Sequence, residues 1–321
     1  MRKGKVSDMD NLITVNSKLT STSSKELTSD LYGRFISFLD ASPKTQQTYE
    51  RAIRQFAKYL YIKGETHPTR ESVLAYREEL TASGHKPTTI QNYITAVKLF
   101  FRWTEQEGLY PNIADHIKGA KLSKEHKKDY LTSSQVKNLL SSVDRDTLRG
   151  SRDYAILSLI VTGGLRTIEV SRADVADLRT VGDSPALFIQ GKGKEEKTDY
   201  VKLPPEVDTA IRAYLKMRGT SNPEAPLFAS TSNNGNGERM STRSISGIVK
   251  EKLVSAGYDS ERLTAHSLRH TAVTLALLGG ESLEEAQQFA RHANIQTTMI
   301  YNHAIERAKN TCSATIASAI F

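Results

Sequence analysis

The most informative part of the sequence is residues 265–301, AHSLRHTAVTLALLGGESLEEAQQFARHANIQTTMIY. Its periodic apolar residues predict helices at about 266–278 and 282–291. His266 and Arg269 stand three residues apart, which places both on one face of the first of these helices. His292 and Tyr301 follow, nine residues apart. This stretch therefore gathers two imidazoles, a guanidinium and a phenol within a short helical segment.

Upstream of this stretch, the sequence predicts a mixed but mainly helical domain over residues 129–321. Arg166 lies in GGLRTIEV, where two glycines precede a short helix. Further helices are expected at about 133–143, 151–162, 205–217 and 242–256. Strand-like runs at 186–190 and 198–203 flank GKGKEEK, which has the glycine and charge content of a hairpin tip and contains Lys192. The predicted fold class is mainly α with a small β-sheet.

Three segments precede that domain. Residues 1–25 are rich in Ser, Thr and Lys and lack apolar periodicity, so we expect a flexible tail. Residues 26–117 show four amphipathic patterns with brief loops between them, which predicts a small helical bundle. Residues 118–128, KGAKLSKEHKK, form a basic stretch that either links two domains or is a solvated loop of one domain. We favour a linker, because a capping box from Thr132 to Gln135 opens a new helical block after it.

Composition narrows the class of protein. The chain of 321 residues has a net charge of +8 and a pI near 9.3. This surplus of positive charge suits a polyanionic partner, although many basic proteins bind no polyanion. A single cysteine, Cys312, excludes an intramolecular disulfide and cysteine-rich zinc frameworks. Neither a membrane span nor a secretory signal is apparent. These features predict a cytoplasmic protein that does not bind membranes.

Each candidate functional residue has a plainer structural interpretation. Arg166 could simply pair with Glu169, and Lys192 and Lys194 could be solvated charges. Tyr301 could be a packing residue whose hydroxyl is hydrogen-bonded. His266 and His270 could bind zinc, but Ser267 stands where a zincin helix has glutamate, and Arg269 would repel the cation. We therefore predict no metal.

Together these residues fit one kind of chemistry. Attack on a phosphodiester builds negative charge on the non-bridging oxygens, and two guanidiniums, Arg166 and Arg269, can bind those oxygens in pairs. Histidines supply donors or a proton acceptor near neutral pH, and Lys192 can protonate the departing oxygen. Tyr301 is a poor nucleophile until nearby cations stabilise its phenolate.

On these motifs the sequence resembles the tyrosine recombinase (phage integrase, Xer-like) family over nearly its whole length. GGLRTIEV is similar to the family's first arginine box, Lys192 to its hairpin lysine and AHSLRHT to its His-x-x-Arg box. His292 and Tyr301 match the last histidine and the nucleophile, and Glu169 matches the acidic residue that braces the first arginine. Residues 26–117 resemble the SAM-like core-binding domain.

The resemblance implies a reaction and an assembly. Arg166 and Arg269 would hold the scissile phosphate with help from His266 and His292, Lys192 would be the general acid, and Tyr301 would form a 3′-phosphotyrosyl link. Four protomers would recombine two double-stranded DNA sites through a Holliday junction, without a cofactor. Plausible phosphate contacts are the polar residues Lys44, Thr45, Thr88, Asn92, Lys121 and Lys124. The residues after Tyr301 would pack either on a neighbouring protomer or, as an alternative, on their own domain.

One departure from the family pattern concerns the residues before the last histidine. The family usually has Leu-Gly there, whereas this chain has Ala290-Arg291, and the loss of the glycine removes an easy helix end. We hypothesise that Arg291 adds a phosphate contact.

Two alternative functions remain open: a type IB topoisomerase-like enzyme that relaxes DNA, and a non-catalytic DNA-binding protein with the same fold. The biological role is open as well. The expectation is integration or excision of a mobile element, or Xer-like resolution. The short tail is expected to leave no room for a separate arm-binding domain, which slightly favours a simple recombinase of a mobile element.

Overall fold

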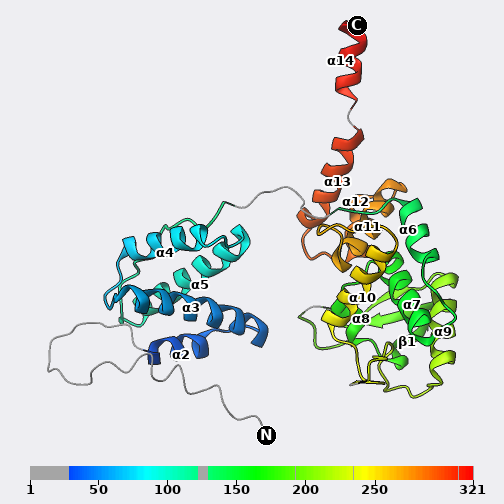
Figure 1. Cartoon of the computed structure of the whole chain (residues 1–321), viewed down its shortest axis with the longest axis horizontal. Coiled ribbons are helices and arrows are strands. Elements are labelled where there is room, and N and C mark those ends of the chain that lie inside the picture. Colours follow the sequence, from blue (N-terminus) through cyan, green and yellow to red (C-terminus); the bar gives the residue numbers. More distant parts are fainter. Residues whose placement is uncertain (1–28, 122–128, 192, 234, 310, 321) are drawn as a thin grey trace. The chain divides into compact units, whose positions relative to one another are not determined.

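The computed structural model describes residues 29–121, 129–191, 193–233, 235–309 and 311–320. The chain forms two compact units, Met1–Lys124 and Glu125–Phe321, shown in Figure 1. The predicted tail (1–25) and most of the predicted linker (118–128) lie outside the described residues. Within those residues, helices predominate and the strands form one small sheet, which confirms the predicted fold class.

Within residues 29–121, the described part of the first unit, four helices form a bundle: α2 (Ser29–Phe38), α3 (Pro43–Lys63), α4 (Arg70–Ala82) and α5 (Pro87–Gln106). In Figure 1, α3 and α5 lie side by side, as their contacts also show. The aromatic rings of Phe35, Phe56, Phe100 and Phe101 are fully buried between the helices. Burial of such large rings is the main favourable contribution to the stability of this small bundle.

Local sequence signals set where these helices begin and end. Ser42 caps α3 by accepting a hydrogen bond from the backbone N–H of Thr45, and Gly64 ends it in the left-handed conformation. Pro87 occupies the first turn of α5, where its missing N–H costs nothing. The four amphipathic patterns in the sequence therefore correspond to four helices.

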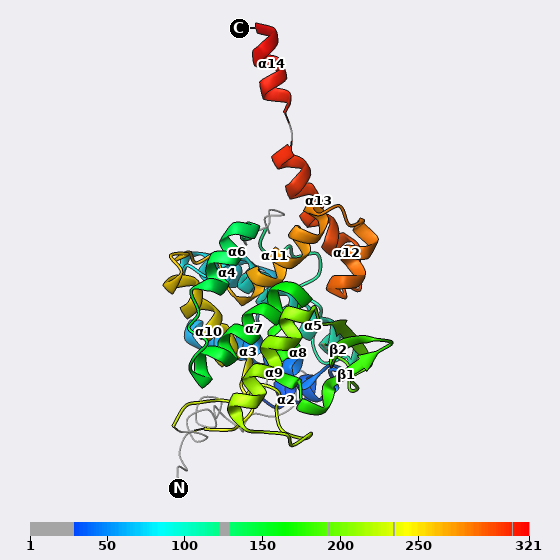
Figure 2. The ribbon, with the colours of Figure 1, turned by 90° about the vertical axis from the view of Figure 1, so that its right-hand side faces the viewer.

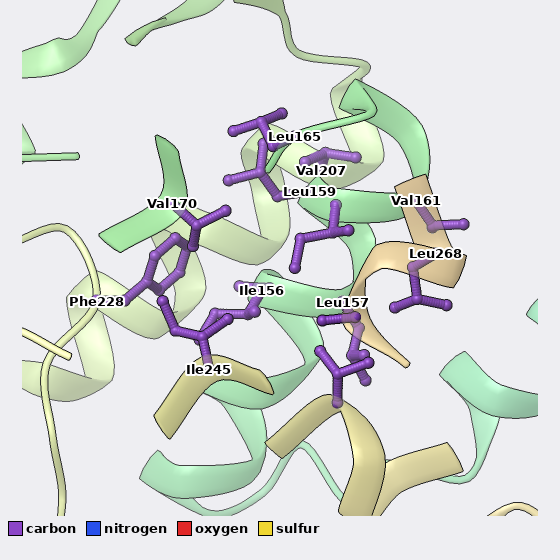
Figure 3. Packing of buried hydrophobic residues seen from close by; sticks show 14 of the residues in the cluster. Ile156, Leu157, Leu159, Val161, Leu165, Val170, Val207, Phe228, Ile245 and Leu268 are labelled. Atoms are coloured by element: carbon purple, nitrogen blue, oxygen red, sulfur yellow. The ribbon is translucent and has the colours of Figure 1, made fainter. Parts of the chain in front are cut away.

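The second unit is built around α7 (Leu148–Gly163), which packs against α9 (Pro205–Arg218) and α11 (Ala265–Leu278). Its other helices are α6 (Ser133–Ser141), α8 (Thr167–Arg172), the short 3-10 helix η1 (Val175–Asp177), α10 (Thr242–Ser255), α12 (Leu283–Ala290), α13 (Gln296–Lys309) and α14 (Cys312–Ile320). Figure 3 shows Leu159 of α7 in one buried cluster with Leu165 and Leu268. Leu165 directly precedes Arg166 and Leu268 directly precedes Arg269, so the core fixes the backbone of both arginines.

The sheet is antiparallel, in the order β1 (Leu178–Val181), β2 (Ser184–Ile189) and β3 (Asp199–Lys202). Leu187 of β2 lies opposite both Leu178 and Val201, which fixes the register on the buried face. Figure 2 shows the sheet at the edge of its unit, beside α8. The two predicted strands are present, whereas β1 was not predicted.

Across the described ranges, no helix is both long and apolar enough to cross a membrane.

Candidate active site

The loop between α7 and α8 positions Arg166. Gly164 ends α7 with φ 57°, in the left-handed region that favours glycine. A Cβ atom there would lie 2.9 Å from the ring of Phe289, so the close approach of α12 also requires glycine. Leu165 is then buried in the core, and Arg166 becomes the N-cap residue of α8 with 30% of its side chain exposed.

Glu169 is the buried centre of the charge cluster. Its Oε1 accepts a hydrogen bond from Nη1 of Arg166 at 2.9 Å, and its Oε2 accepts one from the Arg166 backbone N–H at 2.8 Å. Oε2 also pairs with Nη2 of Arg291 at 3.0 Å. The carboxylate is fully buried, so two guanidiniums compensate a charge that would otherwise be costly to bury.

Arg269 is the most deeply buried of the three arginines, with 1% exposure. Its guanidinium donates to the carbonyl oxygens of Gly164, at the end of α7, and Ala290, the last residue of α12. Burial, reinforced by the positive charges of Arg166 and Arg291, lowers the pKa of Arg269 to about 10. The side chain therefore remains a cation at neutral pH while joining three helices.

Arg166, Arg269 and His266 line one cavity of about 350 Å³. His266 is exposed in the first turn of α11, one turn before Arg269. The hydroxyl-bearing residues Ser246 and Thr264 also line this cavity. Two guanidiniums and hydroxyl groups around one hollow make a site suited to an anion such as a phosphate.

His292 follows α12 and is nearly buried. Its Nδ1 shares a hydrogen bond of 2.9 Å with the Oγ1 of Thr298, which leaves Nε2 for another partner. Burial, followed by the positive charges of Arg269 and Arg166, lowers the pKa of His292 to about 4. The imidazole is therefore neutral at pH 7 and can accept a hydrogen bond or a proton.

Tyr301 lies on α13 and is 3% exposed. Its ring centroid is 4.4 Å from that of His270 and 6.1 Å from that of His292. Burial raises the pKa of the Tyr301 phenol, while the charges of Arg269 and Arg166 act in the opposite direction. The two arginines thus stabilise the phenolate, although burial outweighs them in this structure.

Lys192 lies outside the described residues, and its neighbours in the hairpin make polar contacts with one another and with α8. Nη1 of Arg172 donates to the carbonyl of Gly191 at 3.3 Å. Lys194 pairs with Asp199 at 2.7 Å across the hairpin. The base of β3 is held by Lys197, which bonds to Asp174 at 2.6 Å and also to Asp177.

His270 belongs to the site in a way that the sequence did not predict. It is nearly buried, its Nδ1 lies 3.2 Å from the Oγ1 of Thr274, and its ring stacks parallel to that of Tyr130 at 6.0 Å. It thus lies beside the Tyr301 ring, whereas His266 is exposed on the cavity. Among the residues that the structure describes, no group of three or more side chains could hold a metal ion.

The expected phosphate contacts lie on the surface. Lys44 and Thr45 are exposed in the first turn of α3, and Thr88 and Asn92 are exposed near the start of α5. Lys121 is exposed as well, and Lys124 lies outside the described residues. Nothing in their geometry distinguishes them from other surface polar residues, so their role stays a prediction.

Comparison with known proteins identifies the class to which this fold and site belong. The family model described as the phage integrase family matches residues 129–307, and the N-terminal SAM-like domain of phage integrases matches residues 31–108. The chain belongs to the phage integrase family of tyrosine recombinases, which are enzymes that break and rejoin DNA strands.

Two curated relatives and one solved structure illustrate the likeness. The chain is 30% identical to the tyrosine recombinase XerC of Chlamydia muridarum, with 86% of this chain and 94% of the relative covered. It is 27% identical to a tyrosine recombinase of Synechococcus elongatus, with 86% and 89% covered. The XerH site-specific recombinase, solved bound to a palindromic difH substrate in a post-cleavage complex, matches with a TM-score of 0.71. That match is 21% identical and covers 90% of this chain and 84% of XerH.

Proposed function

We propose that this protein is a site-specific recombinase in which Tyr301 cuts and rejoins DNA through a phosphotyrosyl intermediate. The observation that carries the proposal is the grouping of Arg166, Arg269 and His266 around one cavity, with both guanidinium charges acting on the buried phenol of Tyr301. This grouping supplies the anion site that phosphodiester cleavage needs, and its two cations favour the phenolate of Tyr301 against the opposing effect of burial.

The proposed reaction proceeds in two balanced steps. The phenol oxygen of Tyr301 bonds to the scissile phosphorus while the bond to the 5′ oxygen breaks, and Lys192 gives that oxygen a proton. The neutral imidazole of His292 accepts the phenolic proton, and Arg166 and Arg269 bind the non-bridging oxygens. In the second step a 5′ hydroxyl from the partner strand bonds to the phosphorus while the bond to Tyr301 breaks. The hydroxyl proton passes to Lys192, and the Tyr301 oxygen regains its proton from His292. The phosphotyrosyl bond conserves the energy of the broken bond, so no cofactor is required.

The proposal extends to the assembly. The first unit would contact double-stranded DNA through Lys44, Thr45, Thr88 and Asn92, with residues 118–128 as the linker. Four protomers would exchange strands through a Holliday junction. Ile316 and Ile320 of α14 are 58% and 68% exposed, which fits a helix that packs on a neighbouring protomer. Removing the residues from Asn310 onward would then abolish assembly and leave a folded monomer. If the tail instead packs on its own domain, its removal would destabilise the monomer.

The biological role that we propose is integration or excision of a mobile element, or Xer-like resolution. The family includes proteins with site-specific substrates, such as XerH with difH, and the chain is similar to XerC over most of its length. Both roles use the same chemistry at the same residues.

A plasmid assay tests this function against its alternatives. A supercoiled plasmid that carries two copies of the DNA flanking the gene would be incubated with wild-type protein and with Tyr301→Phe. Recombined circles or catenanes with the wild type alone support recombination. Relaxed circles without recombinants would indicate topoisomerase-like activity, and bound but unaltered plasmid would indicate a DNA-binding protein.

A further inference from the structure

Arg291 has an unusual backbone conformation for a residue with a side chain. It ends α12 with φ 53° and ψ 46°, in the left-handed region where glycine is preferred. Among the described residues, His116 is the only other non-glycine with positive φ. The helix end is nevertheless well formed, because the N–H of Arg291 donates to Gln288 and that of His292 donates to Gln287. At Arg291 this disfavoured conformation is accompanied by side-chain hydrogen bonds that glycine could not make.

The Arg291 side chain is directed into the charge cluster. It is 14% exposed, and its guanidinium donates to the carbonyl of Phe289 at 2.8 Å and to that of Gly164 at 3.1 Å. Its third bond, at 3.0 Å, is to the carboxylate of Glu169. These bonds join the residue before His292 to the loop that carries Arg166.

The same bonds change the charge of the site. If Arg291 were absent, Glu169 would neutralise Arg166, and the cluster would keep only the single positive charge of Arg269. With Arg291 also bound to Glu169, three guanidiniums and one carboxylate leave a net charge of +2. Arg166 therefore keeps more of its positive charge for an anion in the cavity.

We propose that Arg291 is a positioning residue for DNA cleavage, which acts through Glu169 and the Gly164 carbonyl on Arg166 and His292 rather than by binding phosphate itself. The inference rests on the proposed function, since it assigns a role within the same site. It also differs from the hypothesis of a direct phosphate contact, because the guanidinium is largely buried and bonded within the protein. That hypothesis stays a prediction, and the experiment below separates the two.

Arg291→Gly is the informative variant, because it restores the residue that the resemblance to the family leads one to expect and relieves the backbone strain. At saturating suicide DNA substrate, we expect cleavage to slow by about ten- to a hundredfold, because Arg166 is held less firmly. The slope of binding affinity against salt concentration should not change. Arg291→Lys keeps the charge but lacks the planar guanidinium that spans the three acceptors, so its cleavage rate should fall between those of the wild type and Arg291→Gly. His116→Gly relieves the same backbone strain in the first unit and should keep the wild-type cleavage rate.

A second measurement does not depend on cleavage: NMR titration of His292 in the free protein. The charged groups near its ring are Arg166, Arg269, Arg291 and His266, with the phenol of Tyr301 stacked beside it. Removal of one cation favours the protonated imidazole, so Arg291→Gly should raise the pKa of His292, and Arg291→Lys should raise it less. A residue that only stabilised the fold, without an electrostatic effect on the site, would change the unfolding temperature and leave this titration in place.

The outcomes are distinct. Slower saturated cleavage with an unchanged salt slope and a shifted His292 titration supports the inference. Wild-type cleavage together with an unshifted titration overturns it, as does a shallower salt slope with an unchanged saturated rate, which would indicate a direct phosphate contact. If the wild type forms no adduct at all, the proposed function fails, and the His292 titration still decides whether Arg291 acts on that residue.

Discussion

Replacement of Glu169 by glutamine is the perturbation that most directly tests the buried charge cluster. Glutamine has nearly the same shape but no charge. Its carbonyl oxygen can accept from one arginine, while its NH₂ group must face the other. The variant therefore keeps the packing and removes the charge that holds Arg166 and Arg291 together.

The structure sets the size of the effect. Glu169 is fully buried and makes charge-assisted bonds of 2.9 Å to Arg166 and 3.0 Å to Arg291. Hydrogen bonds to charged groups contribute about 1.5 to 3 kcal/mol each, and the partial exposure of both arginines favours the lower end of that range. We therefore expect Glu169→Gln to lower the free energy of unfolding of the second unit by about 3 kcal/mol.

Urea denaturation can follow the two units separately. Trp103, the only tryptophan, lies in the first unit, so its fluorescence reports that unit alone, while circular dichroism reports both. The variant should shift the second unit's transition and leave the Trp103 transition in place. Glu251→Gln is the matched control, because Glu251 is 46% exposed in its pair with Arg149 and should change stability by less than about 1 kcal/mol. A Glu169→Gln protein as stable as the wild type would refute the view that this carboxylate holds the cluster together.

Three further predictions concern the same site. The pKa of His292 is about 4 in the folded chain and 6.5 in the unfolded chain. Between pH 6.5 and 4 the unfolded chain therefore binds a proton at His292 that the folded chain does not bind. The stability contribution of His292 is thus fully present above pH 6.5, and up to about 3 kcal/mol is lost as the pH falls to 4; denaturation of His292→Gln across this range should show a flatter dependence. Leu268→Ala should cost about 2 to 5 kcal/mol of unfolding free energy, and Leu268→Met less than about 1.5 kcal/mol, in urea titrations; equal costs would contradict tight packing beside Arg269. Thr298→Val removes the hydroxyl that bonds to His292 at 2.9 Å and should slow single-turnover cleavage about tenfold, whereas an unchanged rate would show that this bond does not orient the imidazole.

The sequence predicted the parts of the fold that depend on local signals. Gly64 ends α3 in the left-handed conformation, Pro87 opens α5, and the box from Thr132 to Gln135 opens α6. The pairing of Arg166 with Glu169 was also foreseen, because three residues separate them at a helix start. In each case neighbouring residues determine the structure, so a single sequence contains the information.

Features that depend on distant contacts were missed. The rings of Tyr130 and Tyr301 both contact that of His270, but the two tyrosines are 171 residues apart in the sequence and no periodicity connects them. Strand β1 has only four residues, and it forms because Leu178 pairs with Leu187. Arg291 was recognised as a departure from the family pattern, whereas its bonds to Glu169 and Gly164 depend on how α12 packs against the loop after α7.

The central claim is that clustered guanidiniums make the phenol of Tyr301 able to displace a DNA strand. Its most direct test is to trap the protein on nicked suicide duplexes made from DNA flanking its gene and to map the linked peptide by mass spectrometry. We expect a covalent adduct at Tyr301, absent from Tyr301→Phe and strongly reduced in Arg269→Gln. An adduct at another residue, or cleavage that persists in Tyr301→Phe, would contradict it.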